Sequence, residues 1–163
     1  MPTFGRAEAI ETWSVPDAAR MIGVPYRTLR RWLMDGQVRM TFHPRAQRQE
    51  RLRLTCEDTA EAWCIWSLRK AGVSLQAIRR IMVRLESLQE REQRRLTDFK
   101  LVLVDDSGAV TGVHYGGVQE RLTDGQIRID LSRLREQLTE TPGEPVPVGW
   151  MRVLELQEAG YFV

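Results

Sequence analysis

Nine basic side chains, all of them arginines, lie between residues 14 and 54, where only three acidic residues occur. Arg27, Arg30 and Arg31 are close together, and Arg45, Arg48 and Arg51 follow. A guanidinium group is planar, keeps its charge, and can donate paired hydrogen bonds to a phosphate or to the edge of guanine. This concentration of arginine indicates binding to a nucleic acid rather than covalent chemistry.

The cysteines and histidines do not form a recognisable metal or catalytic site. Cys56 and Cys64 are eight positions apart in a predicted helix. That spacing separates them by about 12 Å, too far to share one metal ion. Cys64 stands between two large apolar residues, so we expect its thiol in the core. His43 and His114 are isolated, and we expect each of them in a turn or a strand.

Two further patterns look like catalytic motifs but are better explained by turns. Asp105 and Asp106 are neighbours, and in an extended chain neighbouring side chains point in opposite directions, so they cannot act as a pair. Gly116 and Gly117 lack the lysine and the spacing of a phosphate-binding loop. We therefore expect no enzyme activity, no metal and no cofactor.

Residues 14–36 predict two short helices joined by a tight turn. Ser14 can cap the first helix with Asp17 as its capping-box partner, and Gly23 can end it in a left-handed conformation. Pro25 suits the start of the second helix. Apolar or small residues recur at helical spacing on the inner faces: Val15, Ala18, Ala19, Ile22, Leu29, Trp32 and Leu33. The residues left on or near the outer face of the second helix are Tyr26, Arg27, Thr28, Arg30 and Arg31. This is the form of a DNA-reading helix-turn-helix, although such geometry also occurs inside all-α enzymes.

The stretch after Gly36 predicts a β-hairpin. Apolar residues alternate with polar ones on both sides of a polar segment: Val38, Met40 and Phe42 before it, Leu52 and Leu54 after it. Pro44 lies in the connection, Arg45 and Arg48 at the tip, and Arg51 and Arg53 on the returning strand. Such a hairpin is either a wing that holds cations beside the phosphate backbone or an ordinary exposed ribbon.

Two longer helices are expected next. Thr55 and Asp58 form a capping-box pattern at the start of the third helix, and Gly72 ends it. Ser74 caps a fourth helix whose apolar residues share one side: Leu75, Ile78, Ile81, Met82, Leu85 and Leu88. That stripe fits a coiled-coil-like seam or intramolecular packing. The polar residues 89–95 would carry the helix into solvent, an arrangement that often supports a dimer.

Composition limits the class of protein. The 163 residues, 42% hydrophobic and 28% charged, suit one domain or two small ones. Residues 1–100 hold 19 Lys and Arg against 12 Asp and Glu, whereas residues 101–163 hold 5 against 10. The basic part is therefore the candidate nucleic-acid face. No apolar run reaches about 20 residues, and the start of the chain lacks signal-peptide features, so we expect a cytoplasmic protein with no membrane partner.

The C-terminal part predicts a small antiparallel sheet. Strands are expected at residues 99–104, 109–115 and 126–131, with a helical turn or two over 132–138. A sheet of this size is unstable alone, so it should pack on the fourth helix, a dimer mate or a partner protein. Residues 141–149 contain three prolines and predict a linker, and the chain ends in an apolar tail.

The elements up to this sheet resemble, in their order, the DNA-binding domain of the MerR family of transcription regulators. The matching features are Ala18–Ala19, Gly23–Val24, Thr28–Leu29–Arg30, Trp32, Gly36 and the run Arg69–Ile78. The resemblance covers about residues 12–88. It implies a winged helix-turn-helix, a homodimer held by an antiparallel helix pair, and a palindromic operator.

The resemblance also implies DNA contacts by residues at matching positions: Tyr26, Arg27, Thr28 and Arg30 on the second helix, Arg45 and Arg48 on the wing. We expect Tyr26, Arg27 and Arg30 at base edges and adjacent phosphates, and Arg31 at phosphate or solvent. Arg45, Arg48 and Arg51 would hold the flanking backbone. Many relatives carry an Arg-Tyr-Tyr-like run where this chain has Arg30–Trp32, and the C-terminal half is unlike a metal-loop or large drug-binding domain.

These observations predict an α+β protein with four segments. Residues 1–13 are a loose lead-in, residues 14–98 a winged helix-turn-helix domain with a long fourth helix, residues 99–140 a small β-rich domain, and residues 141–163 a linker and tail. The expected function is a dimeric regulator that binds double-stranded DNA. Alternatives are an antitoxin-like autoregulator whose residues 99–163 bind a partner protein, an excisionase-like architectural DNA protein, and small-molecule sensing between the C-terminal sheet and the fourth helix.

Overall fold

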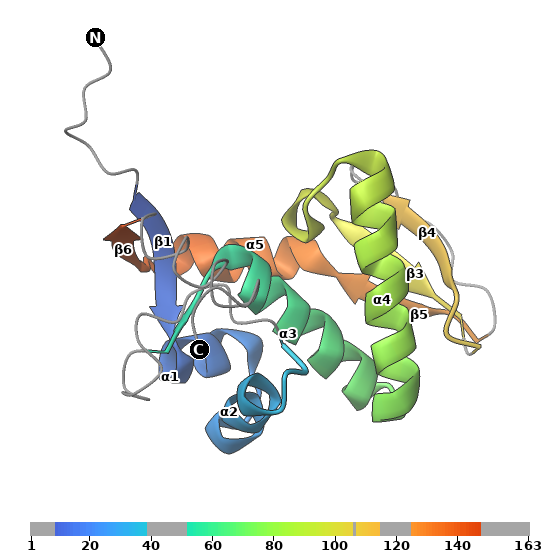
Figure 1. The fold of residues 1–163 in the computed structure, drawn as a ribbon, viewed down its shortest axis with the longest axis horizontal. Coiled ribbons are helices and arrows are strands. Elements are labelled where there is room, and N and C mark those ends of the chain that lie inside the picture. Colours follow the sequence, from blue (N-terminus) through green and yellow to red (C-terminus); the bar gives the residue numbers. More distant parts are fainter. Residues whose placement is uncertain (1–8, 39–51, 106, 115–124, 148–163) are drawn as a thin grey trace, which may run out of the picture.

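The computed structural model describes residues 9–38, 52–105, 107–114 and 125–147 of the chain (Figure 1). The elements are β1 (Ala9–Ser14), α1 (Val15–Ile22), α2 (Tyr26–Met34), β2 (Arg53–Leu54), α3 (Cys56–Lys70), α4 (Leu75–Glu92), a 3-10 turn η2 (Leu96–Asp98), β3 (Leu101–Val104), β4 (Val110–His114), β5 (Ile127–Asp130), α5 (Leu131–Glu140) and β6 (Glu144–Pro147). Helices and two small antiparallel sheets together confirm the predicted α+β class. His114 lies in a strand, as expected.

The helix pair α1 and α2 is positioned by the local signals that the sequence carries. The Ser14 hydroxyl accepts a hydrogen bond from the Asp17 N–H at 3.2 Å. The Asp17 carboxylate accepts from the Arg20 side chain, not from the Ser14 backbone as predicted. Gly23 has φ 81° and ends α1 in the left-handed region that only glycine adopts readily. The turn that follows holds α2 across α1.

Helices α3 and α4 form the middle of the molecule. Thr55 and Asp58 make both halves of the predicted capping box at the start of α3, and Ser74 caps α4. On α4, Ile78, Ile81 and Leu85 are buried within the chain's own core. The structure shows intramolecular packing for these three residues of the stripe, whereas Leu75 is exposed and Met82 and Leu88 are half-buried. The helix ends at Glu92 and the chain then turns back.

The C-terminal sheet has the strand order β4-β3-β5 and lies against the helices (Figure 1). Val102 pairs with Val113 on one side and with Ile129 on the other. Strand β4 contacts α4 and β5 contacts α3, so the expectation that the sheet packs on the long helix is confirmed. The Trp63 indole N–H donates to the Asp130 carbonyl at 3.1 Å, which fixes β5 on α3.

The start of α3 is tied to the turn that follows α4. The Glu57 carboxylate accepts hydrogen bonds from the Leu96 N–H at 3.0 Å and from the Thr97 hydroxyl. Buried side chains from Trp13 to Leu134 belong to one core. The described part of the sheet therefore shares its core with the helices that precede it.

Two predictions about the ends of the chain are wrong for the residues that the structure describes. Residues 9–13, expected in a loose lead-in, belong to β1, and residues 144–147, expected in a linker, form β6. The two strands pair antiparallel, with Ile10 opposite Val146, and β1 also pairs with β2. Strand β6 lies at an edge of its sheet, where the missing N–H groups of its prolines do no harm. The predicted hairpin tip and the apolar tail lie outside the described residues.

Among the described residues, no helix combines the length and the apolar character that a membrane crossing needs.

Candidate nucleic-acid interface

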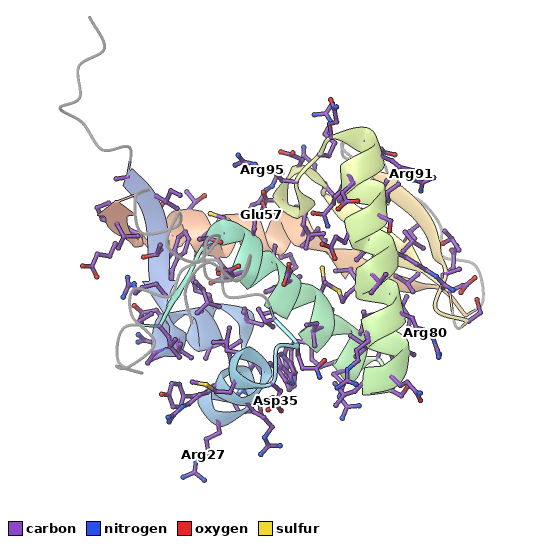
Figure 2. The ribbon with its side chains drawn as sticks, viewed as in Figure 1. Arg27, Asp35, Glu57, Arg80, Arg91 and Arg95 are labelled. Carbon is purple, nitrogen blue, oxygen red and sulfur yellow. The ribbon has the colours of Figure 1, made fainter. Side chains whose placement is uncertain are left out.

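The outer face of α2 is fixed by the residues that α2 buries. Leu29, Trp32 and Leu33 are buried against the core. At 100° per residue, the face opposite to them carries positions 27, 31 and 34, which follow the spacing i, i+4, i+7. These positions hold Arg27, Arg31 and Met34, and all three are exposed. Figure 2 shows Arg27 pointing away from the body of the molecule.

The other predicted contacts on α2 lie beside this face. Tyr26 is 44% exposed in the first turn, whereas Thr28 and Arg30 are half-buried at the two flanks. Arg30 was expected at base edges and Arg31 at phosphate or solvent, but Arg31 has the more exposed position of the two. Helix α2 therefore presents Arg27 and Arg31 centrally, with Tyr26 and Arg30 on one flank.

The wing cations divide into those that the structure describes and those that it does not. Arg45, Arg48 and Arg51 lie outside the described residues. Arg53 is described and is only 16% exposed in its side chain. Its guanidinium donates to the Thr12 hydroxyl at 3.0 Å and to the Thr12 carbonyl at 3.1 Å, and it lies 3.3 Å from the Glu144 carboxylate.

Arg53 therefore joins the three strands of the β2-β1-β6 sheet. The expectation that it belongs to the wing's cationic surface is corrected, because its donors are engaged within the chain. This role of Arg53 could not be predicted from the sequence, since Glu144 is far from Arg53 along the chain.

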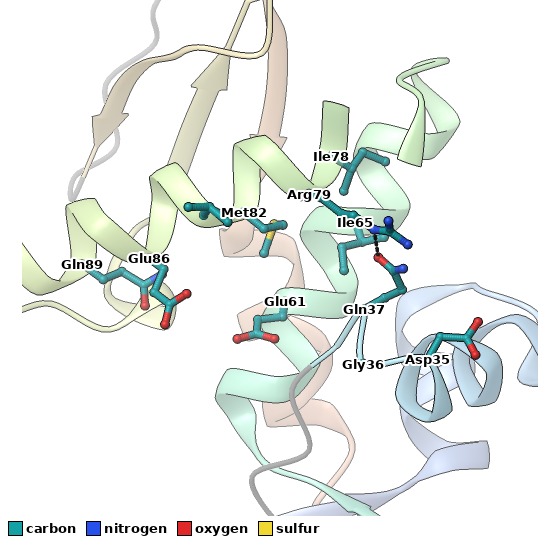
Figure 3. A pocket seen from close by; sticks show the side chains of 11 residues that line it. Asp35, Gly36, Gln37, Glu61, Ile65, Ile78, Arg79, Met82, Glu86 and Gln89 are labelled. Carbon is teal, nitrogen blue, oxygen red and sulfur yellow. Dashed lines mark hydrogen bonds between the residues drawn. The ribbon is translucent and has the colours of Figure 1, made fainter. Parts of the chain in front are cut away.

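The structure adds basic residues that the sequence reasoning did not select. Arg69 and Lys70 are exposed at the end of α3, and the turn at Gly72 with φ 89° leads into α4. The Arg79 guanidinium donates to the Gln37 side chain at 3.2 Å and so joins α4 to the segment after α2 (Figure 3). The turn between α3 and α4 lies on the same lower side of Figure 1 as α2. Basic pairs on both sides of a glycine turn could have drawn attention to this region.

A groove of about 690 Å³ borders this basic region (Figure 3). It lies between the end of α2, α3 and α4, and its charged lining consists of Asp35, Glu61, Glu86 and Arg79. Three carboxylates repel phosphate, so the groove limits the area that DNA can contact. The expected sensing site between the C-terminal sheet and the fourth helix is a different place, since the residues that line this groove come from the segment after α2, from α3 and from α4.

The described residues contain no group of three or more His, Cys, Asp or Glu side chains placed to hold a metal ion. Cys64 is fully buried in α3, which confirms the predicted core thiol. Burial raises the pKa of the Cys64 thiol far above its ordinary value. Burial also raises the pKa of the Cys56 thiol, and the nearby Glu11 and Glu57 carboxylates add to the effect. Neither thiol is activated as a nucleophile, because activation requires a lowered pKa.

A short helix pair with an arginine-rich outer helix, followed by two capped helices, defines a helix-turn-helix DNA-binding domain. Residues 13–85 match the family model described as MerR HTH family regulatory protein. These residues therefore form a MerR-family helix-turn-helix domain, and the predicted resemblance is confirmed. The match ends within α4, so η2, the C-terminal sheet and α5 lie beyond it. The chain matches no curated protein and no solved structure at a significant level.

Proposed function

We propose that the protein is a transcription regulator that binds specific sites in double-stranded DNA, with α2 in the major groove. The observation that carries the proposal is the outer face of α2, where Arg27 and Arg31 are exposed opposite the buried Leu29, Trp32 and Leu33. The MerR-family domain at residues 13–85 supports the same function. An α-helix fits the major groove, and arginine donates two hydrogen bonds to guanine there.

The proposed roles follow from position. Arg27 and Arg30 contact base edges, Tyr26 and Thr28 contact bases or the adjacent backbone, and Arg31 contacts a base or a phosphate. The wing residues Arg45, Arg48 and Arg51 hold the flanking phosphates. Arg69 and Lys70 offer a further backbone contact because they are exposed at the end of α3, near a turn that lies on the same lower side of Figure 1 as α2.

Selection from random DNA, followed by mobility-shift titration at two salt concentrations, tests this proposal. We expect one preferred sequence and an affinity that falls steeply with salt, because phosphate contacts release counterions. Arg27→Ala and Arg30→Ala should each cost about 1–3 kcal/mol and relax the preference at one base pair. Arg48→Ala should weaken all sequences alike and reduce the salt slope by about 1. Arg133→Ala, an exposed arginine on α5, is the matched control and should change neither.

Failure of the wild-type protein to prefer any sequence would refute regulation through specific sites. Equal losses for Arg27→Ala on the selected site and on random DNA would make Arg27 a backbone contact. An unchanged salt slope for Arg48→Ala would refute the wing contact.

We propose a homodimer on a palindromic site as the first arrangement on DNA, as the family resemblance implies. One observation favours the excisionase-like alternative, in which copies bind tandem direct sites. On α4, Ile78, Ile81 and Leu85 are buried inside the chain, so these three side chains are not available to form a dimer seam. Sedimentation of the free protein and footprinting separate the two: a dimer with one palindromic footprint supports the regulator, whereas a monomer with direct repeats supports the alternative.

A further inference from the structure

Met34 is an apolar side chain exposed on the face proposed to meet DNA. Among the described residues, the exposed large hydrophobic side chains are Tyr26, Met34, Leu75 and Val83. Two of these four lie on α2, a helix of only nine residues. Met34 is 46% exposed, although methionine is among the residues most often buried in proteins.

Packing among the described residues gives no reason for a methionine at this position. Met34 belongs neither to the buried core cluster nor to the partly buried side chains packed against it. It lies on the side of α2 opposite Leu29, Trp32 and Leu33, in line with Arg27 and Arg31. A polar side chain would interact with solvent better at this exposed position. The apolar side chain therefore indicates an apolar contact outside the chain.

We propose that Met34 contacts the 5-methyl group of thymine, so that α2 carries a thymine-reading position beside its guanine-reading arginines. The inference rests on the proposed function. In the major groove thymine is distinguished by its methyl group, which is recognised by apolar contact. The unbranched, polarisable methionine side chain can adapt to such a small apolar surface.

The helix geometry also predicts where the thymine lies. Met34 follows Arg27 by seven residues, which at 1.5 Å per residue is about 10 Å along the helix axis. Base pairs in duplex DNA are spaced by about 3.4 Å along the duplex axis, and the groove is inclined to that axis, so a helix lying along the groove spans no more than about three steps over this distance. The thymine read by Met34 should therefore lie within about three base pairs of the base pair whose preference Arg27→Ala relaxes.

The test uses the full chain and the DNA site obtained by selection. Each thymine in the site is replaced singly by deoxyuridine, which removes the methyl group and keeps the base pair. We expect one position at which the wild-type protein loses affinity about three- to fivefold, the effect of one buried methyl group. Met34→Ala should bind the thymine and deoxyuridine versions of that position equally. Val83→Ala, which removes an exposed apolar side chain on α4, is the control and should keep the wild-type discrimination.

Two results overturn the inference while leaving the proposed function intact. One is a specific site at which no single deoxyuridine weakens binding by the wild-type protein, or which contains no thymine in the predicted region. The other is Met34→Ala protein that still discriminates thymine from deoxyuridine as the wild type does. Absence of any sequence preference in the wild-type protein would refute the proposed function and this inference together.

Discussion

Leu85→Ala tests whether the apolar stripe of α4 stabilises the single chain. Leu85 is 0% exposed and shares this side of α4 with Ile78 and Ile81, which are also buried. Truncating a fully buried leucine removes its transfer free energy and leaves a cavity, which together cost about 3 kcal/mol, within an observed range of about 2–5 kcal/mol. That is a large part of the roughly 5–15 kcal/mol by which a domain is stable.

The expected change is easily measured. For a chain of this length a loss of about 3 kcal/mol lowers Tm by roughly 6–12 °C. Urea denaturation followed by circular dichroism gives the free energy of unfolding, and repeating it at two protein concentrations separates folding from association. The difference between Leu85→Ala and wild type should be the same at both concentrations, because the contact lies within one chain.

Val83→Ala is the matched control on the same helix, since Val83 is 61% exposed. Its effect should stay within about 0.5 kcal/mol, as for most surface substitutions. The reasoning is refuted if Leu85→Ala leaves the free energy of unfolding unchanged, or if Val83→Ala costs more than Leu85→Ala. The second result would mean that the opposite face of α4 is the one that packs, as in a dimer through Val83.

Three further predictions concern the rest of the described chain. A side chain at Gly143 would place its Cβ 2.6 Å from the Thr12 carbonyl oxygen. Gly143→Ala should therefore shift β6 away from β1 and lower the free energy of unfolding by about 1–3 kcal/mol. Unaltered thermal stability of the variant would contradict this prediction. Thr55→Ala removes half of the capping box of α3 and should lower the free energy of unfolding by about 1 kcal/mol in the same assay. An unchanged free energy of unfolding is expected only if a water molecule replaces the hydroxyl. Burial raises the pKa of the Cys64 thiol. An aromatic disulfide reagent at mildly alkaline pH should therefore modify Cys56 first and Cys64 only on unfolding. Equal rates of modification at the two cysteines would count against the buried position of Cys64.

Helix α2 and its neighbours were predictable because their signals are local. Ser14, Gly23, Thr55 and Ser74 act within four residues of their own positions, through caps and a left-handed turn. Helical spacing of apolar residues then gives the inner face of each helix. Interactions of this range can be recognised in the sequence alone, and so the helix pair and its arginines were predicted directly from residues 14–36.

The pairings between distant segments were not predictable in the same way. Strand β1 was missed because its partner β6 lies more than 130 positions away, as the Thr12–Glu144 hydrogen bond shows with a separation of 132 residues. The same cause explains why Arg53 was expected among the wing cations. Its partners Thr12 and Glu144 are distant along the chain and are brought beside it only by the fold.

The sequence by itself determined the helix-turn-helix, the caps, the small C-terminal sheet and the concentration of arginine, because each depends on neighbours along the chain. The tertiary structure alone decided which surfaces stay open. It buried Ile78, Ile81 and Leu85 of α4 in the core, engaged Arg53 inside the molecule, and left Met34 exposed on the same face of α2 as Arg27 and Arg31. Burial depends on what the rest of the chain brings to a surface, and no local pattern contains that information.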